Sequence, residues 1–345
     1  MSGVLRIETK GTWREMGQQL GEEFKEALTE CVNRYFYNRL DTKQCEPGVR
    51  KIEAIMKEHC PELIDETEGI AQAAGLDYTG VLGYRFFNEV KYFVDEDCTP
   101  QQDCSAVFLA SDADGPMLAR NCDLARFDDR VVQLCRVSRP TEGPASVLLS
   151  YLAMLTGSGL NEYGLAIGNA SVHTTKTFGN EGIPGGVLYH LLISKCKTVA
   201  DATDILSKYP CLGKGANTLI ADAQGNSTLF ELVAGRIAPM TPRRKDRDWQ
   251  ACMNHYFSPE VPNRPKPDYL QNSYARYGRV HHMLEDNDMP RSFDTIREVI
   301  REISQPGPVA LDLNTGYSTI AAAKQKTLYL ADGPPLKTEY EPITL

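Results

Sequence analysis

The first hundred residues carry hydrophobic side chains at helical spacing. Alternation over Leu5 to Thr9 predicts a short opening strand. Apolar residues then recur every fourth position, at Met16, Leu20, Phe24 and Leu28. That spacing places one apolar stripe along a helix. Thr12 followed three residues later by Glu15 predicts a capping box at its start. Further helices are predicted at 48–57, 61–74 and 78–93.

Beyond residue 104 the pattern changes to short strands separated by turn residues. Residues 105–110 and 117–121 flank the turn 112–115 and predict a hairpin. Further strands are predicted at 131–137, 146–155, 217–221, 227–233, 318–323 and 327–331, and residues 159–169 predict a strand, a turn and a second strand. Helices are predicted at 185–196, 198–208, 273–284 and 293–303. Runs of strands separated by pairs of helices predict an α+β layer architecture. The polar stretch 95–103 is expected to be irregular and flexible.

Composition narrows the function classes. The chain has 345 residues, 37 basic and 46 acidic, with a net charge of -9. This sign disfavours nucleic acid as a partner. No apolar run approaches the ~20 residues that a membrane span needs, and the N-terminus has no secretory pattern, so we expect a cytoplasmic protein without a membrane partner. The ten cysteines are scattered without a metal-binding spacing, so neither a metal nor another cofactor is expected, and nine are expected to be ordinary buried thiols.

The remaining cysteine, Cys104, stands at the head of the predicted hairpin. The return strand brings Arg120 and Asp123 back beside it. A thiol at the head of a strand, with these two residues opposite, is typical of an N-terminal-nucleophile (Ntn) hydrolase. The base in such an enzyme is the free α-amine of the nucleophile itself, with a pKa of about 7.7–8.0. That amine exists only if the bond between Asp103 and Cys104 is cut, so we predict fragments 1–103 and 104–345 that stay packed together.

Short motifs that are distributed along most of the chain resemble those of a known protein family. They are Gly11-Thr-Trp-Arg-Glu-Met-Gly-Gln-Gln-Leu-Gly, Arg85-Phe-Phe-Asn-Glu89, Asp103-Cys-Ser, Arg120-Asn-Cys-Asp123, Asn161-Glu-Tyr-Gly-Leu-Ala, Ala221-Asp-Ala-Gln-Gly with Glu231, Asn254-His255 and Asn272-Ser-Tyr-Ala-Arg276. In order and spacing they resemble the acyl-CoA:6-aminopenicillanate (isopenicillin N) acyltransferase family, peptidase family C45. More distantly the sequence is similar to choloylglycine hydrolases.

The resemblance implies a four-layer αββα sandwich with an N-terminal helical segment. The mainly helical residues 1–103 and the core 104–345 would form one structural unit. It also implies autocatalytic cleavage of a zymogen before Cys104 and acyl transfer through a thioester on its thiol. By position, Asp123 would hold the new α-amine, Arg120 would lie near the thiolate, and Asn254 would bind the oxyanion.

The same resemblance suggests Asn169, Arg276 and His255 as substrate-binding residues, although the alignment at 169 could shift toward Ser171. Position 120 is arginine, as in bile-salt hydrolases, rather than the glutamine of the penicillin acyltransferase. Position 122 is cysteine where an aromatic residue is commoner. These departures make the identity of the substrate less certain than the reaction mechanism.

We therefore predict an acyltransferase or amidohydrolase acting on linear amide bonds. Its partners would be a small acyl amide or acyl thioester, acyl-CoA among them, and an amine or water acceptor. The two fragments would associate with each other, and a homo-oligomer is a further option.

Three alternatives stay open. The chain could be an uncleaved, catalytically silent module for binding or scaffolding. It could be a plain amidase of N-acyl amino acids, β-alanyl amines or bile-salt-like conjugates. It could also be a papain-like peptidase in which Cys104 pairs with His255.

Other residues have a plainer interpretation. Arg120 and Asp123 could form a structural ion pair. His281 and His282 are expected on a solvated helix face. The glycine-rich stretch 213–218 lacks phosphate-loop spacing. The basic stretch 243–247 is expected to be a solvated loop, with steering of an anionic acyl donor such as coenzyme A as its alternative role.

Overall fold

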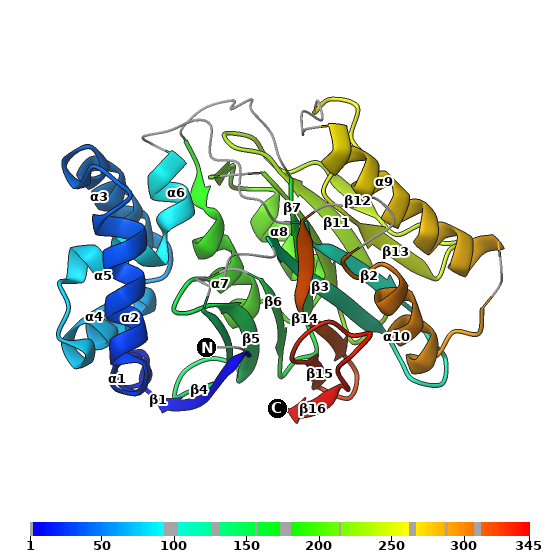
Figure 1. Cartoon of the computed structure of the whole chain (residues 1–345), viewed down its shortest axis with the longest axis horizontal. Helices are drawn as coiled ribbons and strands as arrows, with labels where there is room; N and C mark the ends of the chain where they lie inside the picture. The colour runs from blue at the N-terminus through cyan, green and yellow to red at the C-terminus, as the bar shows by residue number, and fades with distance from the viewer. Residues whose placement is uncertain are drawn as a thin grey trace.

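Two stacked β-sheets between layers of helices form the body of the protein (Figure 1). A computed structural model describes residues 3–92, 103–125, 132–155, 157–172, 181–213, 215–261, 267–286, 289–306 and 312–345. The stretch 95–102, for which the sequence predicts an irregular approach to Cys104, lies outside these residues. Within the described chain, no helix combines the length and apolar character that crossing a membrane requires.

The N-terminal segment is one strand followed by helices. Its elements are β1 (Leu5–Gly11), α1 (Trp13–Glu23), α2 (Lys25–Cys31), the π-helical turn η1 (Val32–Tyr37), α3 (Thr42–His59), α4 (Glu62–Ala74), α5 (Tyr78–Arg85) and α6 (Phe87–Tyr92). The predicted capping box of Thr12 and Glu15 is confirmed. The predicted start of the helix 48–57 was wrong. The observed helix, α3, begins at Thr42, because Asp41 caps it there. Pro47 lies in its second turn, where it removes a single backbone N–H.

The larger sheet has eight strands in the order β1-β4-β5-β6-β7-β10-β11-β12. After β1, these are β4 (Gln133–Pro140), β5 (Ser146–Tyr151), β6 (Ser158–Asn161), β7 (Ala166–Ser171), β10 (Ala216–Ala221), β11 (Ser227–Leu232) and β12 (Met240–Pro242). β1 pairs in parallel with β4 at the edge, so the N-terminal segment is part of the sheet. A separate short pair joins β8 (Ile183–Pro184) to β9 (Cys211–Leu212).

The smaller sheet has six strands in the order β13-β2-β3-β14-β15-β16. These are β13 (Trp249–Cys252), β2 (Ser105–Leu109), β3 (Met117–Ala125), β14 (Leu313–Ala322), β15 (Thr327–Ala331) and β16 (Glu341–Thr344). The predicted hairpin is β2 and β3, in antiparallel register. All of β2 is buried, because β2 lies inside the smaller sheet and both faces of that sheet are covered.

Helices cover the outer face of each sheet. α7 (Gly185–Lys195) and α8 (Val199–Leu206) contact the larger sheet, and α9 (Pro267–His281) and α10 (Phe293–Glu302) contact the smaller one. A second π-helical turn, η2 (His282–Asp286), follows α9. Alternate residues of β2 enter different cores: Ala106 and Phe108 face the larger sheet, whereas Val107 and Leu109 face α9 and α10. The predicted αββα sandwich is confirmed, with the N-terminal helices beyond α7 (Figure 1).

Candidate active site

Cys104 lies at the beginning of β2, in the core between the two sheets. Its side chain is 2% exposed. On one side β2 pairs with β13, where Cys252 is opposite Ala106. Asn254 lies two residues beyond the end of β13, and Arg276 links it to Cys104 by donating to Asn254 Oδ1 and to the backbone oxygen of Cys104. On the other side Ala106 is opposite Arg120 of β3, so Arg120 is a diagonal neighbour of the thiol. Strand pairing thus brings Cys104 and Arg120 together, and the segment after β13 brings Asn254 to the same place.

The Arg120 guanidinium contacts the thiol directly. Its Nη2 lies 3.2 Å from Cys104 Sγ and is the donor of that contact. Nε donates to the backbone oxygen of Asn169 at 2.8 Å, and Nη1 donates to the Tyr317 hydroxyl at 2.7 Å. These anchors fix the direction of the guanidinium. A buried positive group at this distance stabilises a thiolate over a thiol.

Gly168 of β7 allows the two sheets to approach each other here. A Cβ atom built on Gly168 would lie 3.1 Å from the Cβ of Ala106 and 3.7 Å from the Cβ of Arg120. A larger residue would push β7 away from β2 and β3. The glycine therefore keeps Asn169 within reach of the Arg120 guanidinium.

Asp123 is a fully buried carboxyl group with one open oxygen. The Thr315 hydroxyl donates to Oδ1 at 2.6 Å, whereas Oδ2 has no hydrogen-bond partner among the described residues. Burial, as the largest cause, raises the pKa of Asp123 well above its ordinary value. Its backbone oxygen accepts from the backbone N–H of Asp103 at 3.3 Å. Asp123 therefore lies beside the bond that is predicted to be cut.

Arg276 of α9 reaches Cys104 from the outer side of the smaller sheet. Its side chain is 0% exposed. Nη1 donates to the backbone oxygen of Cys104 at 3.0 Å, and Nη2 donates to Asn254 Oδ1 at 2.7 Å. Nε donates to Asn272, one helical turn earlier, at 2.6 Å. Arg276 thus holds the peptide group between Cys104 and Ser105 and the side-chain amide of Asn254 in place.

Asn254 is fixed by contacts on each of its polar groups. Its backbone N–H donates to Ser273 Oγ at 2.9 Å, and Nδ2 donates to the backbone oxygen of Ser171 at 2.7 Å. Asn217 donates to the backbone oxygens of Met253 and His255 and so holds this segment from β10. Asn169 and Ser171, the two alternatives of the alignment, thus each contribute a backbone oxygen. One binds Arg120 and the other binds Asn254.

His255 lies in an aromatic cluster. Nδ1 is 2.7 Å from Ser273 Oγ, and the ring packs against Tyr274, Phe257 and Tyr277. Burial, followed by the charge of Arg276, lowers the pKa of His255 to about 4. Its imidazole is therefore neutral near pH 7.

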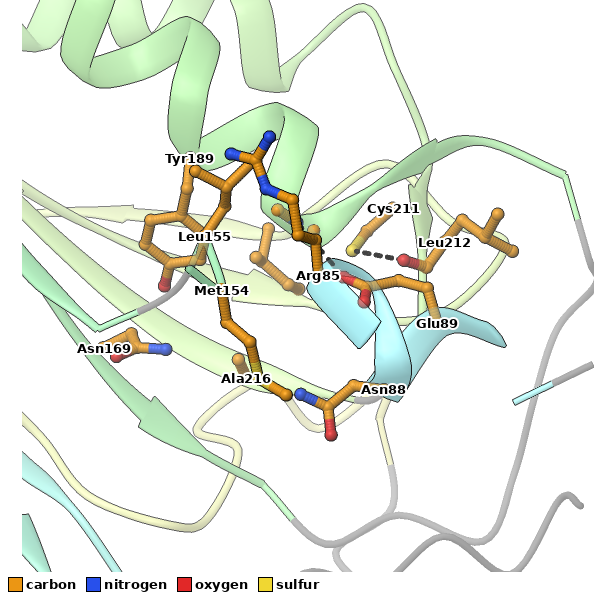
Figure 2. A pocket seen from close by; sticks show the side chains of 13 residues that line it. Arg85, Asn88, Glu89, Met154, Leu155, Asn169, Tyr189, Cys211, Leu212 and Ala216 are labelled. Carbon is orange, nitrogen blue, oxygen red and sulfur yellow. Dashed lines mark hydrogen bonds between the residues drawn. The ribbon is translucent and has the colours of Figure 1, made fainter. Parts of the chain in front are cut away.

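A recess next to Asn169 is lined partly by residues of the N-terminal segment. Its free volume is about 40 Å³. Figure 2 shows Asn169 and Tyr189 beside it, with Asn88 and Glu89 contributed by α6. The remaining lining residues are Arg85, Met154, Leu155, Gly185, Gly186, Cys211, Leu212, Ala216 and Leu232. The lining of the recess is mostly apolar, with a few polar groups.

The other candidates have local partners. Arg243 lies over the ring of Phe108 with 5.5 Å between the guanidinium carbon and the ring centroid. Arg244 pairs with Asp246, and Arg247 pairs with Glu285. His281 closes α9 and packs edge-on against Trp249. Over the described ranges, no group of three His, Cys, Asp or Glu side chains has the arrangement of a metal site.

Sequence reasoning missed residues that complete the site. Tyr317 and Thr315, both on β14, orient Arg120 and Asp123, and Ser273 orients Asn254. Cys122 was noted only as a departure, yet its hydrogen bond with Cys104, together with burial, raises the pKa of Cys122 well above its ordinary value. The motif beginning at Asn272 contains Ser273 and was the one available signal for it. Nothing local marks Thr315 or Tyr317, which reach the site only through strand pairing.

Comparisons with known proteins give one family and several distant structures. The family described as acyl-coenzyme A:6-aminopenicillanic acid acyl-transferase matches residues 110–324, more than half of the chain. Penicillin V acylase from Agrobacterium tumefaciens is 17% identical, with 70% of this chain and 86% of that chain covered and a TM-score of 0.47. A mutant of conjugated bile acid hydrolase from Clostridium perfringens is 10% identical, with 70% and 92% covered and a TM-score of 0.46. None of the curated proteins matches the chain.

Proposed function

Because the chain belongs to the acyl-coenzyme A:6-aminopenicillanic acid acyl-transferase family, we propose that it is a self-processed cysteine enzyme that cleaves or transfers an acyl group through a thioester on Cys104. One observation carries the proposal. A buried thiol at the head of β2 contacts the Arg120 guanidinium at 3.2 Å, beside a carboxyl group with an open oxygen. Arg120 stabilises the thiolate, and Asp123 receives the amine that scission creates.

Activation begins with scission of the chain. Cys104 Sγ attacks the carbonyl carbon of Asp103, the peptide bond becomes a thioester, and water releases fragment 1–103. The new α-amine of Cys104 titrates at about 7.7–8.0 in an unperturbed chain, which suits a general base near neutral pH. The open Oδ2 of Asp123 suits an N–H of this amine, and the resulting contact favours the ionised form of Asp123.

Acyl transfer then follows on the mature enzyme. The thiolate attacks the acyl carbonyl, and the α-amine passes the proton to the leaving group. The Asn254 amide has two N–H groups, of which Ser171 takes one, so the second remains for the developing oxyanion. An amine or water resolves the thioester. In this scheme the Cys104 thiol and its α-amine carry out the proton transfers.

The apolar recess beside Asn169 is the proposed place for the acyl group. Asn169 lines the recess, and its backbone oxygen holds the same guanidinium that contacts the thiol. An acyl chain in the recess would therefore end near Cys104. Asn169, in the lining of the recess, is proposed to bind the acyl amide. Arg276 and His255 are proposed to shape the substrate site on the side of Asn254.

The two fragments are proposed to stay together in the cytoplasm. β1 remains hydrogen-bonded to β4, and Glu66 of one fragment pairs with Arg136 of the other at 2.6 Å. The nine cysteines that the structure describes are buried and in no disulfide, which fits a compartment that keeps thiols reduced.

Mass spectrometry of the denatured protein tests the proposal. We expect two fragments, the second beginning at Cys104, and a single full-length chain for Cys104→Ala. Cys135→Ala, another buried thiol between the sheets, is the matched control and should process normally. An active wild type that stays in one piece would overturn self-processing, and loss of its activity in His255→Ala would favour the papain-like alternative. A single chain without activity would favour the silent module.

Product analysis separates transfer from hydrolysis. The thioester partitions between water and an added amine such as 6-aminopenicillanate or cysteine. A rising yield of acylated amine at constant thioester consumption indicates a transferase. A yield that stays at zero indicates the plain amidase.

A further inference from the structure

Asp103, the residue before the scissile bond, has an unusual environment for a carboxyl group. Its side chain is 0% exposed, and neither carboxyl oxygen has a hydrogen-bond partner among the described residues. Arg276 Nη2 lies 3.6 Å from Oδ2, close enough for an ion pair. The hydrogen bonds of that guanidinium go instead to the backbone oxygen of Cys104, to Asn254 and to Asn272. A buried acid without hydrogen bonds destabilises the fold, so its retention calls for an explanation.

Several charged or titratable groups face this carboxyl group. Arg276 and Tyr269 approach it from α9, Asp123 from β3, and Cys104 follows it in the chain. Burial is the largest influence and raises the pKa of Asp103 to about 6, while Arg276 opposes the rise. At neutral pH the group is therefore mostly ionised, and it is a stronger base than an ordinary aspartate.

Self-processing requires a base that the mature enzyme does not need. Before scission the nitrogen of Cys104 is an amide, which cannot accept a proton from the thiol. His255 is the histidine considered above as a partner of Cys104. Its ring contacts Ser273 and packs against Tyr274. We propose that the Asp103 carboxylate is the base for the chain's own scission, a step that rests on the self-processing proposed above.

The proton then follows a closed path. The Asp103 carboxylate takes the proton of Cys104 Sγ, and the thiolate forms a bond to the Asp103 carbonyl carbon. As the C–N bond breaks, the carboxylic acid returns the proton to the departing nitrogen of Cys104. Water attacks the thioester, and the new amine takes a proton from that water and passes it to the departing sulfur, which leaves as the thiol. The new carboxyl group releases its proton to solvent. The products are a terminal carboxylate at Asp103 and a free amine at Cys104.

The position of Asp103 limits this role to activation. The carboxylate is attached to the residue that supplies the scissile carbonyl, so it is tethered next to both reacting groups. After scission it belongs to the other fragment, and the α-amine becomes the base. Asp103 therefore affects how fast the enzyme matures, and the turnover of each mature site is independent of it.

A pulse-labelled full-length chain from cell-free translation tests the role. Asp103→Asn keeps the shape and removes the base, and we expect scission to slow by roughly 10²-fold or more. The matched control is Glu231→Gln. Glu231 is another buried acid whose pKa is raised by burial, and it accepts hydrogen bonds from Phe257 and Ser258 on a different part of the chain. Scission in this control should stay within about threefold of wild type.

The pH profile provides a second readout in the wild-type chain. The scission rate should rise between about pH 5 and pH 7 with a midpoint near 6, the pKa of Asp103. A flat profile would overturn the role, even if Asp103→Asn failed to fold. Wild-type rates in a folded Asp103→Asn chain would overturn it too, and would leave self-processing by Cys104 in place. A wild-type chain that never yields a fragment beginning at Cys104 would instead reject the proposed function.

Turnover of the matured variant completes the test. Asp103→Asn chains that have been cut should turn over at the wild-type rate for each free Cys104 terminus. A loss of turnover with normal scission would place Asp103 in the mature site and contradict its role as the base of activation.

Discussion

Two buried clusters in this protein combine carboxylates with arginines, and they behave in opposite ways. In the first, Glu66 of α4 lies between Arg85 of α5 and Arg136 of β4. In the second, Asp103 faces Arg276 of α9 at 3.6 Å. The pKa of Glu66 is lowered to about 2 and that of Asp103 is raised to about 6, although both acids are buried.

The difference comes from the number of direct contacts. Glu66 has two arginines in contact, and Arg85 further donates to the Thr67 hydroxyl and to the backbone oxygen of Ala153. These contacts outweigh the penalty of burial. Arg276 directs its hydrogen bonds to other groups, so burial dominates at Asp103. The cluster of Glu66, Arg85 and Arg136, here called the complete cluster, joins the N-terminal segment to the core. The pair of Asp103 and Arg276, here called the incomplete cluster, lies at the bond to be cut.

The largest effect should come from breaking the complete cluster. Glu66→Ala leaves Arg85 and Arg136 buried without their acid, and we expect the free energy of unfolding to fall by about 3–5 kcal/mol in urea titrations. The control is the exposed pair of Arg279 and Glu302, where Glu302→Ala should cost less than about 1 kcal/mol. Equal losses in the two variants would mean that the buried cluster contributes no more than a surface pair.

The second effect concerns turnover rather than stability. Asn254→Ala removes the proposed oxyanion donor, and we expect kcat to fall by roughly 10²–10³-fold in a folded, processed enzyme. Asn226→Ala, at the exposed turn between β10 and β11, is the control and should retain full turnover. A decrease of less than about threefold in Asn254→Ala would reject the oxyanion role.

The third effect is a change of stability with pH that depends on Asp103. The experiment compares Cys104→Ala with the same chain carrying Asp103→Asn, so that both remain uncut. Because the folded-state pKa of Asp103 is raised from 3.8 to about 6, the folded chain holds a proton that the unfolded chain has lost in this window. The stability of Cys104→Ala relative to the double variant should therefore fall by about 2 kcal/mol between pH 4 and pH 7. His255 titrates in both chains, so its contribution cancels, and a constant difference would contradict the raised pKa.

The sequence predicted the elements that local patterns determine. The hairpin of β2 and β3, the capping box of Thr12 and the helices on both outer faces follow from periodicity and turn residues. β13 escaped prediction because its four residues follow a basic, proline-containing loop and show no alternation long enough to read. Yet β13 pairs antiparallel with β2, and the segment that follows β13 carries Asn254 toward the Cys104 end of that strand.

The site was predictable as far as the resemblance reached. Cys104, Arg120 and Asp123 lie on one hairpin, so their proximity follows from local sequence. Thr315 and Tyr317 lie almost two hundred residues away from their partners along the chain, and only pairing of β14 with β3 brings them in. The charge balance at Asp103 depends on where α9 packs, because that packing decides which acceptors Arg276 meets. A single sequence carries no local signal for such a balance.

The smallest effect should come from His255, and it distinguishes the two cysteine mechanisms. The imidazole has a pKa of about 4 and lies against Ser273 and Tyr274, so near pH 7 it is neutral and held away from a proton-transfer role. We expect His255→Gln to change kcat by less than about threefold, with any larger change confined to KM, because the residue is proposed to shape the substrate side of the site. A papain-like pair would instead lose roughly 10²–10⁴-fold in kcat. Steady-state kinetics on the processed variant decides between them, and a large fall in kcat with normal scission would transfer the role of base from the Cys104 amine to this histidine.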